Sequence, residues 1–211
     1  MTKSWLSIGL LAAVATPSPS GAAEGTPTTA VLSLDGQWSL AVDPQNIGRQ
    51  QRWHANPVAE AKSAKVPWII QEAFPAYHGV AWYWRDFVAP ANPHPGGRYL
   101  LRFWAVDYLA EVWLNGVSVG GHEGGETPFA LDVTASIKPN ERNRLAVRVL
   151  NPTNQPIDGI ALAETARRCK VIPYAAGAGF NHGGITDSVE LLCVPAVRVG
   201  DLFVTARTEQ T

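Results

Sequence analysis

Side chains able to ligate a metal or transfer a proton are densest in the stretch GGHEGGETP, residues 120–128. It holds one imidazole and two carboxylates, those of His122, Glu123 and Glu126. The stretch lacks the second histidine of the zinc-protease motif HExxH, and its glycines disfavour the helix that this motif needs. Two or three ligands on a flexible loop are a weak metal signal. We therefore interpret the cluster as structural and expect neither a metal nor a cofactor.

Aromatic side chains form a second group with possible binding chemistry. Tyr77 and His78 lie in a stretch without strand character, and Trp82 and Trp84 share one face of the alternating run that follows. Aromatic faces can carry a sugar ring, but large aromatic residues also fill the cores of β-sandwiches. We expect Trp82 and Trp84 in the core, and Tyr77 and His78 at the surface as candidate carbohydrate contacts.

Cys169 and Cys193 are the only cysteines of the chain. A disulfide between them would close a loop of about 25 residues and stabilise the fold by roughly 3 kcal/mol. The alternative is a pair of buried free thiols, because Cys193 lies inside the apolar run VELLCVP. The sequence leaves both possibilities open, and neither cysteine belongs to a CxxC or zinc-site pattern.

The elements that must position these residues have the pattern of a β protein. Four short runs occupy residues 98–134, and the second and third flank Asn115-Gly116, which suits a type I′ hairpin turn. We expect the loop between the third and fourth runs to span residues 120–128. Period-two alternation in the first and last runs predicts these core-facing residues: Tyr99, Leu101, Phe103, Ala105, Phe129, Leu131 and Val133.

The N-terminal part of the chain predicts three further features. Residues 31–42 should form a pair of strands around Asp35-Gly36, with Trp38 in the core. A short helix is expected near residues 58–62. Residues 68–78 should form a surface loop that crosses one end of a sandwich.

Residues 81–88 and 144–150 alternate as strands. The second strand should direct Leu145, Val147 and Val149 inward, and Arg144 and Arg148 outward. Arg85 lies within an apolar run and should be paired, because an unpaired buried charge is very costly. Asp86 and Asp107 are the candidate partners.

The C-terminal part begins with a long stretch of weak strand character, residues 151–184. A loop of that length is usually functional or contains a local helix, for which residues 160–169 are the candidate. Residues 189–194 return to a strand, and residues 197–206 suggest a last one.

Sixteen prolines and nineteen glycines, together with short β-rich runs, favour an all-β sandwich or barrel. The net charge of −1 offers no basic field for nucleic acid and no membrane-binding patch. At the N-terminus, Lys3, the apolar residues 5–15 and the small residues 21–23 predict a cleavable signal peptide, residues 1–23. We therefore expect a secreted or periplasmic protein with a disordered lead, residues 24–30.

The run AVDYLAEVWLNG, followed by VGGHEGGETPF and LDVT, resembles the N-terminal sugar-binding domain of glycoside hydrolase family 2. That family includes β-galactosidases, β-glucuronidases and β-mannosidases. Three more stretches are similar to it: VP…YHGVAWYWRDF, NRLAVRVLNP and GGITDSVEL. The resemblance covers roughly residues 31–203 and implies a jelly-roll β-sandwich of the galactose-binding type, which we assign to residues 31–211.

Retaining glycosidases need two carboxylates about 5–5.5 Å apart. In this family both glutamates lie on a TIM barrel of about 250 residues that follows the sugar-binding domain. Asn140-Glu141 matches the dipeptide of the family's acid/base glutamate, but its setting, KPNERN, predicts a surface turn. The resemblance therefore implies O-glycosyl hydrolysis for the family but no activity for this chain alone.

In β-galactosidases and β-glucuronidases an aspartate of this domain reaches the substrate, seven residues before the isoleucine of a Gly-Ile motif. Counting back from Ile185 leads to Ala178, a departure from the family pattern. Phe180, Asn181 and His182 remain as nearby candidates, because amide and imidazole groups suit sugar hydroxyls. Alternatively, these residues satisfy the loop backbone.

Three functions follow from these observations. The first is a secreted, non-catalytic carbohydrate-binding or scaffold domain that binds β-linked glycosides, from a truncated or split glycosidase. The second is an accessory subunit that completes a catalytic barrel on another chain. The third is an interaction or adhesion module without a sugar site.

Overall fold

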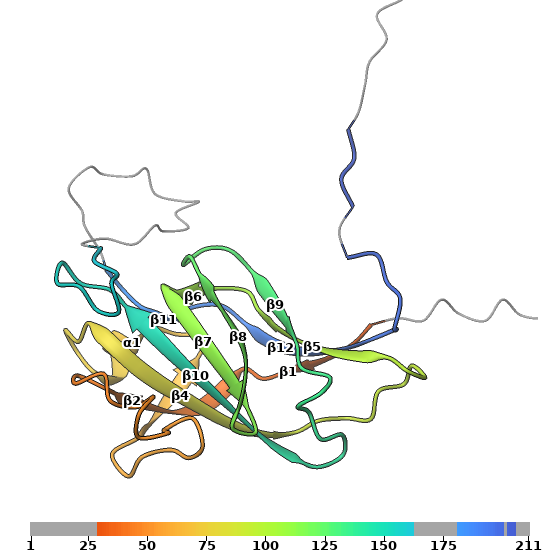
Figure 1. Ribbon diagram of the computed structural model, residues 1–211, viewed down its shortest axis with the longest axis horizontal. Helices are drawn as coiled ribbons and strands as arrows, with labels where there is room; N and C mark the ends of the chain where they lie inside the picture. The colour runs from red at the N-terminus through yellow and green to blue at the C-terminus, as the bar shows by residue number, and fades with distance from the viewer. Residues whose placement is uncertain (1–28, 163–180, 201, 206–211) are drawn as a thin grey trace, which may run out of the picture.

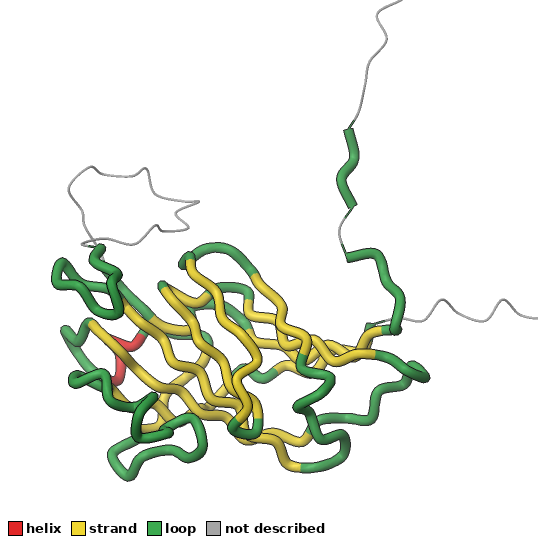
Figure 2. Tube along the Cα trace, in the orientation of Figure 1, coloured by secondary structure: helices red, strands yellow, loops and turns green. Residues whose placement is uncertain are grey.

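The computed structural model describes residues 29–162, 181–200 and 202–205, and almost all of its regular elements are strands (Figures 1 and 2). One antiparallel sheet has six strands in the order β3 (Lys62–Val66), β2 (Gly36–Val42), β4 (Gly79–Val88), β10 (Arg142–Asn151), β7 (Leu109–Leu114) and β8 (Val117–Glu123). A second has the order β1 (Ala30–Ser33), β12 (Val189–Val194), β5 (Arg98–Phe103) and β9 (Phe129–Asp132). A short third pair joins β11 (Gly184–Ile185) to β6 (Val106–Asp107). The predicted all-β sandwich is confirmed.

The main core lies between the two large sheets, because both sheets present apolar residues to it at period two. The predicted inward residues of β5 are all buried there, with Leu101 and Phe103 fully inaccessible. The predicted inward positions of β10 behave in the same way, and Leu145, Val147 and Val149 are all buried in this core. Trp38 is also in this core, as its sequence position predicts.

A second apolar cluster covers the outer face of the six-stranded sheet. Trp82 and Trp84 of β4 are 0% and 2% exposed, and they lie beneath the long loop of residues 43–61. This loop is anchored by Trp53, whose backbone carbonyl accepts a hydrogen bond from Trp84 Nε1 at 2.8 Å. Arg148 of β10 points to the same outer face, as predicted, yet it is fully buried rather than solvated.

The hairpin of β7 and β8 is confirmed, with Asn115 and Gly116 at φ of 54° and 80°. The predicted loop of residues 120–128 begins too early, because β8 continues through Glu123 and pairs with β7. Glycine permits this extension. A Cβ on Gly121 would collide with the Ala110 carbonyl oxygen, so only a residue without a side chain allows the strands to approach here.

The predicted strand pair of residues 31–42 is wrong. Both strands form, but β1 pairs with β12 and β2 pairs with β3 and β4, so the two belong to different sheets. The chain crosses between the sheets at Asp35, whose carboxylate accepts hydrogen bonds from Ser188 Oγ and the Val189 amide. These long-range contacts take the place of a local hairpin.

Two other local predictions also fail. No helix forms near residues 58–62, where a turn leads into β3. Within the described residues, the helix forms instead at α1 (Ile70–Ala73). This helix lies within the predicted loop across the end of the sandwich. Arg85 pairs with neither candidate carboxylate, because its Nη1 donates to the backbone carbonyl of Gln37. Asp86 binds Arg142 and Arg144 instead.

The C-terminal segment does not form the predicted strand in residues 197–200 and 202–205. Its exposed apolar side chains are those of Val197, Val199, Leu202, Phe203 and Val204. Of the helix expected over residues 160–169, the described residues 160–162 are not helical and the others lie outside the described part of the chain. Within the described residues, no helix has the length and apolar character needed to cross a bilayer.

Candidate functional site

Three loops meet at one end of the six-stranded sheet because their strands are antiparallel neighbours. Val42 at the end of β2 pairs with Ala81 near the start of β4, and Asn151 at the end of β10 pairs with Gly79. The segments that follow β2 and β10 therefore emerge beside the segment that precedes β4, at the left of Figure 1.

These loops enclose a pocket of about 320 Å³, which we call the end pocket. Its size is near the lower limit of small-molecule sites, about 300–1,000 Å³. Two of the predicted carbohydrate contacts, Tyr77 and His78, belong to its wall. The full lining is Asp43, Pro44, Gln45, Asn46, Tyr77, His78, Gly79, Val80, Pro156, Ile157 and Asp158.

Behind the pocket wall, the buried side chain of Asn151 organises a chain of hydrogen bonds. Its Oδ1 accepts from Gln71 Nε2 and lies 3.0 Å from His78 Nδ1. Its Nδ2 donates to Asn181 Oδ1. The chain ends on two backbone carbonyls, since Gln71 Nε2 also donates to the Tyr77 carbonyl and Asn181 Nδ2 donates to that of Pro152.

These two terminal carbonyls set the donor-to-acceptor direction of every hydrogen bond in this network, because a carbonyl oxygen can only accept. Asn151 must therefore present its oxygen to His78, and His78 Nδ1 must carry the proton that it donates. In the neutral imidazole, Nε2 is then an acceptor. His78 is exposed, so the network prepares a hydrogen-bond acceptor on the pocket wall.

Tyr77 contributes a neutral hydroxyl to the same wall. Its hydroxyl donates to the Val80 carbonyl at 2.7 Å and retains lone pairs that can accept. Burial, together with the negative charge of Asp43, raises the pKa of Tyr77 to about 12. The phenol therefore stays protonated at physiological pH.

The carboxylate of Asp43 is occupied by the fold. Its two oxygens accept from the backbone amides of Ile47 and Gly48, at 2.9 and 2.8 Å, and from Trp82 Nε1 at 3.1 Å. Asp43 thus fixes the start of the 43–61 loop over the tryptophan cluster. It shapes the end pocket rather than offering a free base.

The Asp158 carboxylate is held by a cationic network. Arg148, fully buried, donates to Asp158 and to Glu111, and Arg49 bridges the same two carboxylates at 2.8 Å. Burial acts to raise the pKa of Asp158, but hydrogen bonds from Asn46 and Arg49 and the arginine charges outweigh it and hold that pKa below its ordinary value. The network ties the loops after β2 and β10 to β7.

The structure brings together part of the predicted set. Tyr77 and His78 line the end pocket, and Asn181 joins them through Asn151. Both polar groups of the Asn181 side chain are bound to protein atoms, as in the alternative that it satisfies the loop backbone. His182 is half-buried beside it. Phe180 and Ala178 lie outside the described residues.

Sequence reasoning missed Asn151 and Asp158. Asn151 carries one available signal, because a polar residue there ends the apolar alternation of β10 directly before a proline. Asp158 carries none, since its role depends on an arginine of β10 and on a distant loop.

His122 and Glu123 form contacts with the fold, whereas Glu126 Oε1 is buried without a hydrogen-bond partner among the described residues. His122 stacks on Phe129 with ring centroids 4.6 Å apart and its Nε2 lies 2.7 Å from Thr127 Oγ1. Glu123 accepts a hydrogen bond from the Tyr108 hydroxyl at 2.9 Å. Among the described residues, no group of three or more potential ligands is placed to hold a metal ion.

Cys193 is a free thiol, buried on β12. Burial raises the pKa of this thiol. Its candidate partner, Cys169, lies outside the described residues. Glu141, which follows Asn140 in the dipeptide of the family's acid/base residue, is exposed on the turn before β10.

Comparison with known proteins agrees with this architecture. The family model described as "Glycosyl hydrolases family 2, sugar binding domain" matches residues 31–195. The chain belongs to this family. Its family 2 domain is 35% identical over 134 residues to a β-glucuronidase of Paenibacillus borealis, covering 61% of this chain and 22% of that protein. The β-glucuronidase of Canis lupus familiaris is 28% identical over 206 residues, covering 88% of this chain and 32% of that protein.

Solved structures of Ruminococcus gnavus β-glucuronidase share the fold. The complex with C6-substituted uronic isofagomine has a TM-score of 0.64 and 26% identity, covering 80% of this chain and 30% of that one. The complex with D-glucuronic acid has a TM-score of 0.63 and 27% identity, with the same coverage. The family 2 domain described here thus spans about a third or less of the length of these relatives.

Proposed function

We propose that this family 2 domain binds β-linked glycosides at the end pocket and has no hydrolytic centre of its own. The observation that carries the proposal is the 3.0 Å contact between His78 Nδ1 and Asn151 Oδ1 on the wall of a pocket with the size of a small-molecule site, since it leaves Nε2 of the neutral imidazole as an acceptor. Sugar hydroxyls would donate to His78 and to the Tyr77 oxygen. The β-glucuronidase relatives, one of them solved with D-glucuronic acid, make glucuronides the first ligands to test.

The test is a calorimetric titration of the purified chain with glucuronic acid, galactose, mannose and their β-linked oligomers. Loss of one hydrogen bond is worth about 1 kcal/mol, so His78→Ala should weaken binding about fivefold. The matched control is Asn154→Ala, an exposed residue of the neighbouring loop that does not line the pocket. Equal affinity in the two variants would contradict the assigned pocket.

The absence of hydrolysis is tested separately with a chromogenic aryl β-D-glucuronide. Retaining hydrolysis needs two carboxylates about 5–5.5 Å apart. In the end pocket, Asp43 and Asp158 are instead held by backbone amides and arginines. We expect no release of the aryl group above the uncatalysed rate, and turnover by the purified chain would refute this part of the proposal.

A second candidate is an accessory domain that binds a separate catalytic chain. The exposed apolar side chains of residues 197–200 and 202–204 favour it, with Val197 at 89% and Phe203 at 92% exposure. A surface segment of this kind is typical of a protein contact. The test mixes this chain with the part of the Paenibacillus borealis β-glucuronidase that follows the matched region. A complex lost in Phe203→Asp would support the accessory role, and independent migration of the two chains would count against it.

We also propose that the protein is exported and cleaved after Ala23. The proposal is supported by the cationic Lys3 and the apolar stretch that precedes the small residues 21–23. The intact mass of the protein secreted by a bacterial host should correspond to a chain that begins at Glu24. A protein that retains residues 1–23 would exclude this cleavage site.

A further inference from the structure

A second pocket opens where β2 extends beyond its edge partner. Lys62, the first residue of β3, pairs with Leu40, so Ala41 and Val42 have no strand beside them on that edge. The chain before β3 turns aside, with the Ala61 amide bonded to the Val58 carbonyl. The space left, about 360 Å³, is the edge pocket, lined by Ala41, Val42, Gln51, Trp53, Val58, Glu60 and Phe74.

Two aromatic side chains, those of Trp53 and Phe74, line the edge pocket from opposite faces of β2. Trp53 belongs to the outer cluster over the six-stranded sheet, with Ala41. Phe74 packs against the main core, with Val42. Both rings are half-buried, so each keeps part of its surface open to the pocket.

Contacts with the fold fix the Trp53 ring and the backbone of Phe74 before any ligand binds. Trp53 Nε1 donates to Gln51 Oε1 at 3.0 Å, and its ring lies against Trp82 at a centroid distance of 6.4 Å. The Phe74 amide donates to the Ile70 carbonyl, and Lys62 Nζ lies 4.3 Å from the centre of the Phe74 ring. Such preorganisation lowers the entropy lost when a ligand binds.

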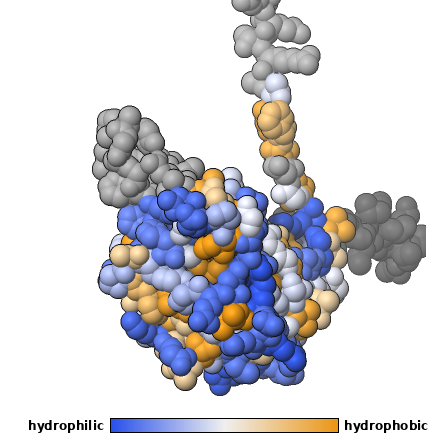
Figure 3. Space-filling model, turned by 60° about the vertical axis from the view of Figure 1, so that its left-hand side comes forward, coloured by the Kyte–Doolittle hydropathy of each residue, from blue (hydrophilic) through white to orange (hydrophobic). Residues whose placement is uncertain are grey.

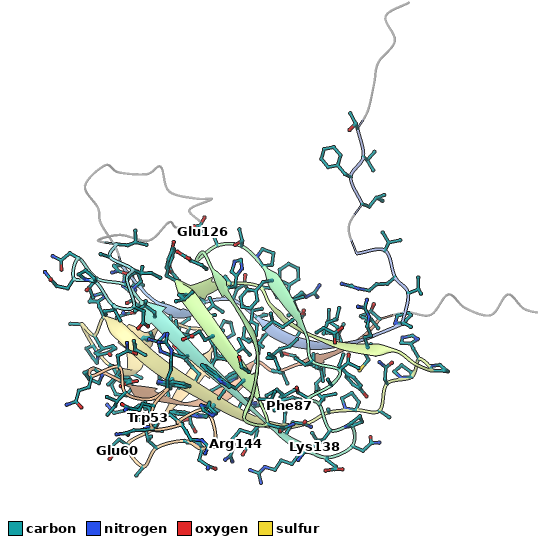
Figure 4. All side chains as sticks on the ribbon, in the orientation of Figure 1. Trp53, Glu60, Phe87, Glu126, Lys138 and Arg144 are labelled. Atoms are coloured by element: carbon teal, nitrogen blue, oxygen red, sulfur yellow. The ribbon has the colours of Figure 1, made fainter. Side chains whose placement is uncertain are left out.

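The rim supplies polar groups of complementary kinds. Glu60 is exposed, and within the described part of the chain no hydrogen bond or ion pair engages its carboxylate, which can only accept. Gln51 uses its oxygen for Trp53, so its Nε2 remains a donor. Figure 4 shows Trp53 and Glu60 on the same loop, and Figure 3 shows hydrophobic and hydrophilic residues intermixed at this end of the molecule.

We propose that the edge pocket is a second carbohydrate subsite, which takes a neutral pyranose ring. The apolar C–H face of the sugar packs on Trp53 and Phe74, where it loses contact with water. Its hydroxyls donate to Glu60 and accept from Gln51. A uronic acid is disfavoured, because its carboxylate would face that of Glu60. The Lys62 ammonium, which would attract a carboxylate, is already engaged by the Phe74 ring and by the Ala73 carbonyl. This inference rests on the proposed carbohydrate binding but concerns a different pocket and a different class of sugar.

The test follows the indole N–H resonances of the full chain by NMR during titration with lactose, cellobiose and glucuronic acid. We expect the Trp53 resonance to shift saturably with the neutral disaccharides and not with glucuronic acid. Glu60→Ala should weaken disaccharide binding about fivefold or more, and Glu60→Gln, which retains an acceptor oxygen, should recover part of it. Phe74→Ala should weaken binding further by removing one wall.

Glu141→Ala is the matched control, since Glu141 is an exposed glutamate that lines neither pocket. Disaccharide binding that is unchanged in Glu60→Ala, or a Trp53 resonance that does not move, overturns the inference. If glucuronic acid still binds through His78 in that case, the proposed function stands. If no sugar binds in either pocket, both proposals fall, and a Trp53 shift produced only by another protein would also overturn the subsite.

Discussion

At the scale of single residues, Asn151 connects three parts of the chain that sequence separates widely. Its amide joins the segment before β4, the helix α1 and the segment around residue 181. The side chain is fully buried, and it bonds the half-buried Gln71 and Asn181 as well as the exposed His78. Replacing Asn151 leaves several donors and acceptors without partners. The resulting loss in the free energy of unfolding is larger than the contribution of a single hydrogen bond.

We predict that Asn151→Ala lowers the free energy of unfolding by about 2–3 kcal/mol, measured by urea denaturation. In the Asn151→Ala background, His78→Ala should have no further effect on sugar affinity. The His78 imidazole has then already lost the partner that fixes which of its nitrogens carries the proton. Asn154→Ala, in the exposed part of the same loop, should change stability by about 0.5 kcal/mol or less. Equal stability in the two variants would mean that water replaces the Asn151 contacts at no cost.

Asp158 predicts how stability depends on pH. The folded state holds its pKa below the ordinary value of 3.8, because hydrogen bonds from Asn46 and Arg49 and the arginine charges outweigh burial. Its contribution is therefore complete above that ordinary value and is lost as pH falls through the lower folded pKa. Asp158→Asn should be less stable at neutral pH and should lose less stability than the wild type between about pH 5 and about pH 2. Parallel pH profiles of the two proteins would exclude this linkage.

At the scale of elements, the β7–β8 hairpin depends on more than its turn dihedrals. Asn115 has the positive φ that the turn requires, and its side chain also bonds the Ser136 carbonyl, Asn143 Oδ1 and the Arg144 amide. It thus ties the turn to the segment that enters β10. Gly116 has a positive φ and open space around its Cβ position.

Three variants separate these effects by thermal and urea unfolding. Gly116→Val should cost about 1–2 kcal/mol through the backbone alone. Asn115→Gly keeps the turn conformation but loses the side-chain bonds, and Asn115→Ala loses both, so it should be the most destabilised at about 3 kcal/mol. If Asn115→Gly is as stable as the wild type, the side-chain contacts contribute nothing.

At the scale of the whole molecule, the two ends of the domain meet in the four-stranded sheet. β12 lies between β1 and β5, and five of its six residues are buried. β1 is an edge strand whose residues are mostly exposed. The C-terminal strand should therefore contribute far more to the fold than the N-terminal one.

We predict that a chain ending at Ser188 does not fold, because the buried side chains it lacks contribute about 1.5–3 kcal/mol each, comparable in sum with the stability of a whole domain. A chain that begins at Leu34 should lose only β1 and still fold. Near-ultraviolet circular dichroism and urea unfolding distinguish the two. A folded chain without β12 would contradict the central place of that strand.

The all-β class, the inward faces of β5 and β10, the Asn115-Gly116 turn and the family 2 motifs could be predicted from the sequence. Each depends on local information, since alternation at period two and a turn dipeptide act within a few residues. The same kind of reasoning proposed Tyr77 and His78, which lie in a segment without strand character and line the end pocket.

The tertiary structure alone decided which strands pair and which polar groups meet. β1 and β2 are neighbours in sequence but lie in different sheets, because Asp35 binds the start of β12 instead of closing a hairpin. Arg85 donates a hydrogen bond to the backbone carbonyl of Gln37, and the partners of Asn151 and Asp158 lie on segments distant in sequence. A buried polar group is satisfied by whichever partner the packed chain brings within reach, and that choice depends on long-range geometry that no local pattern contains.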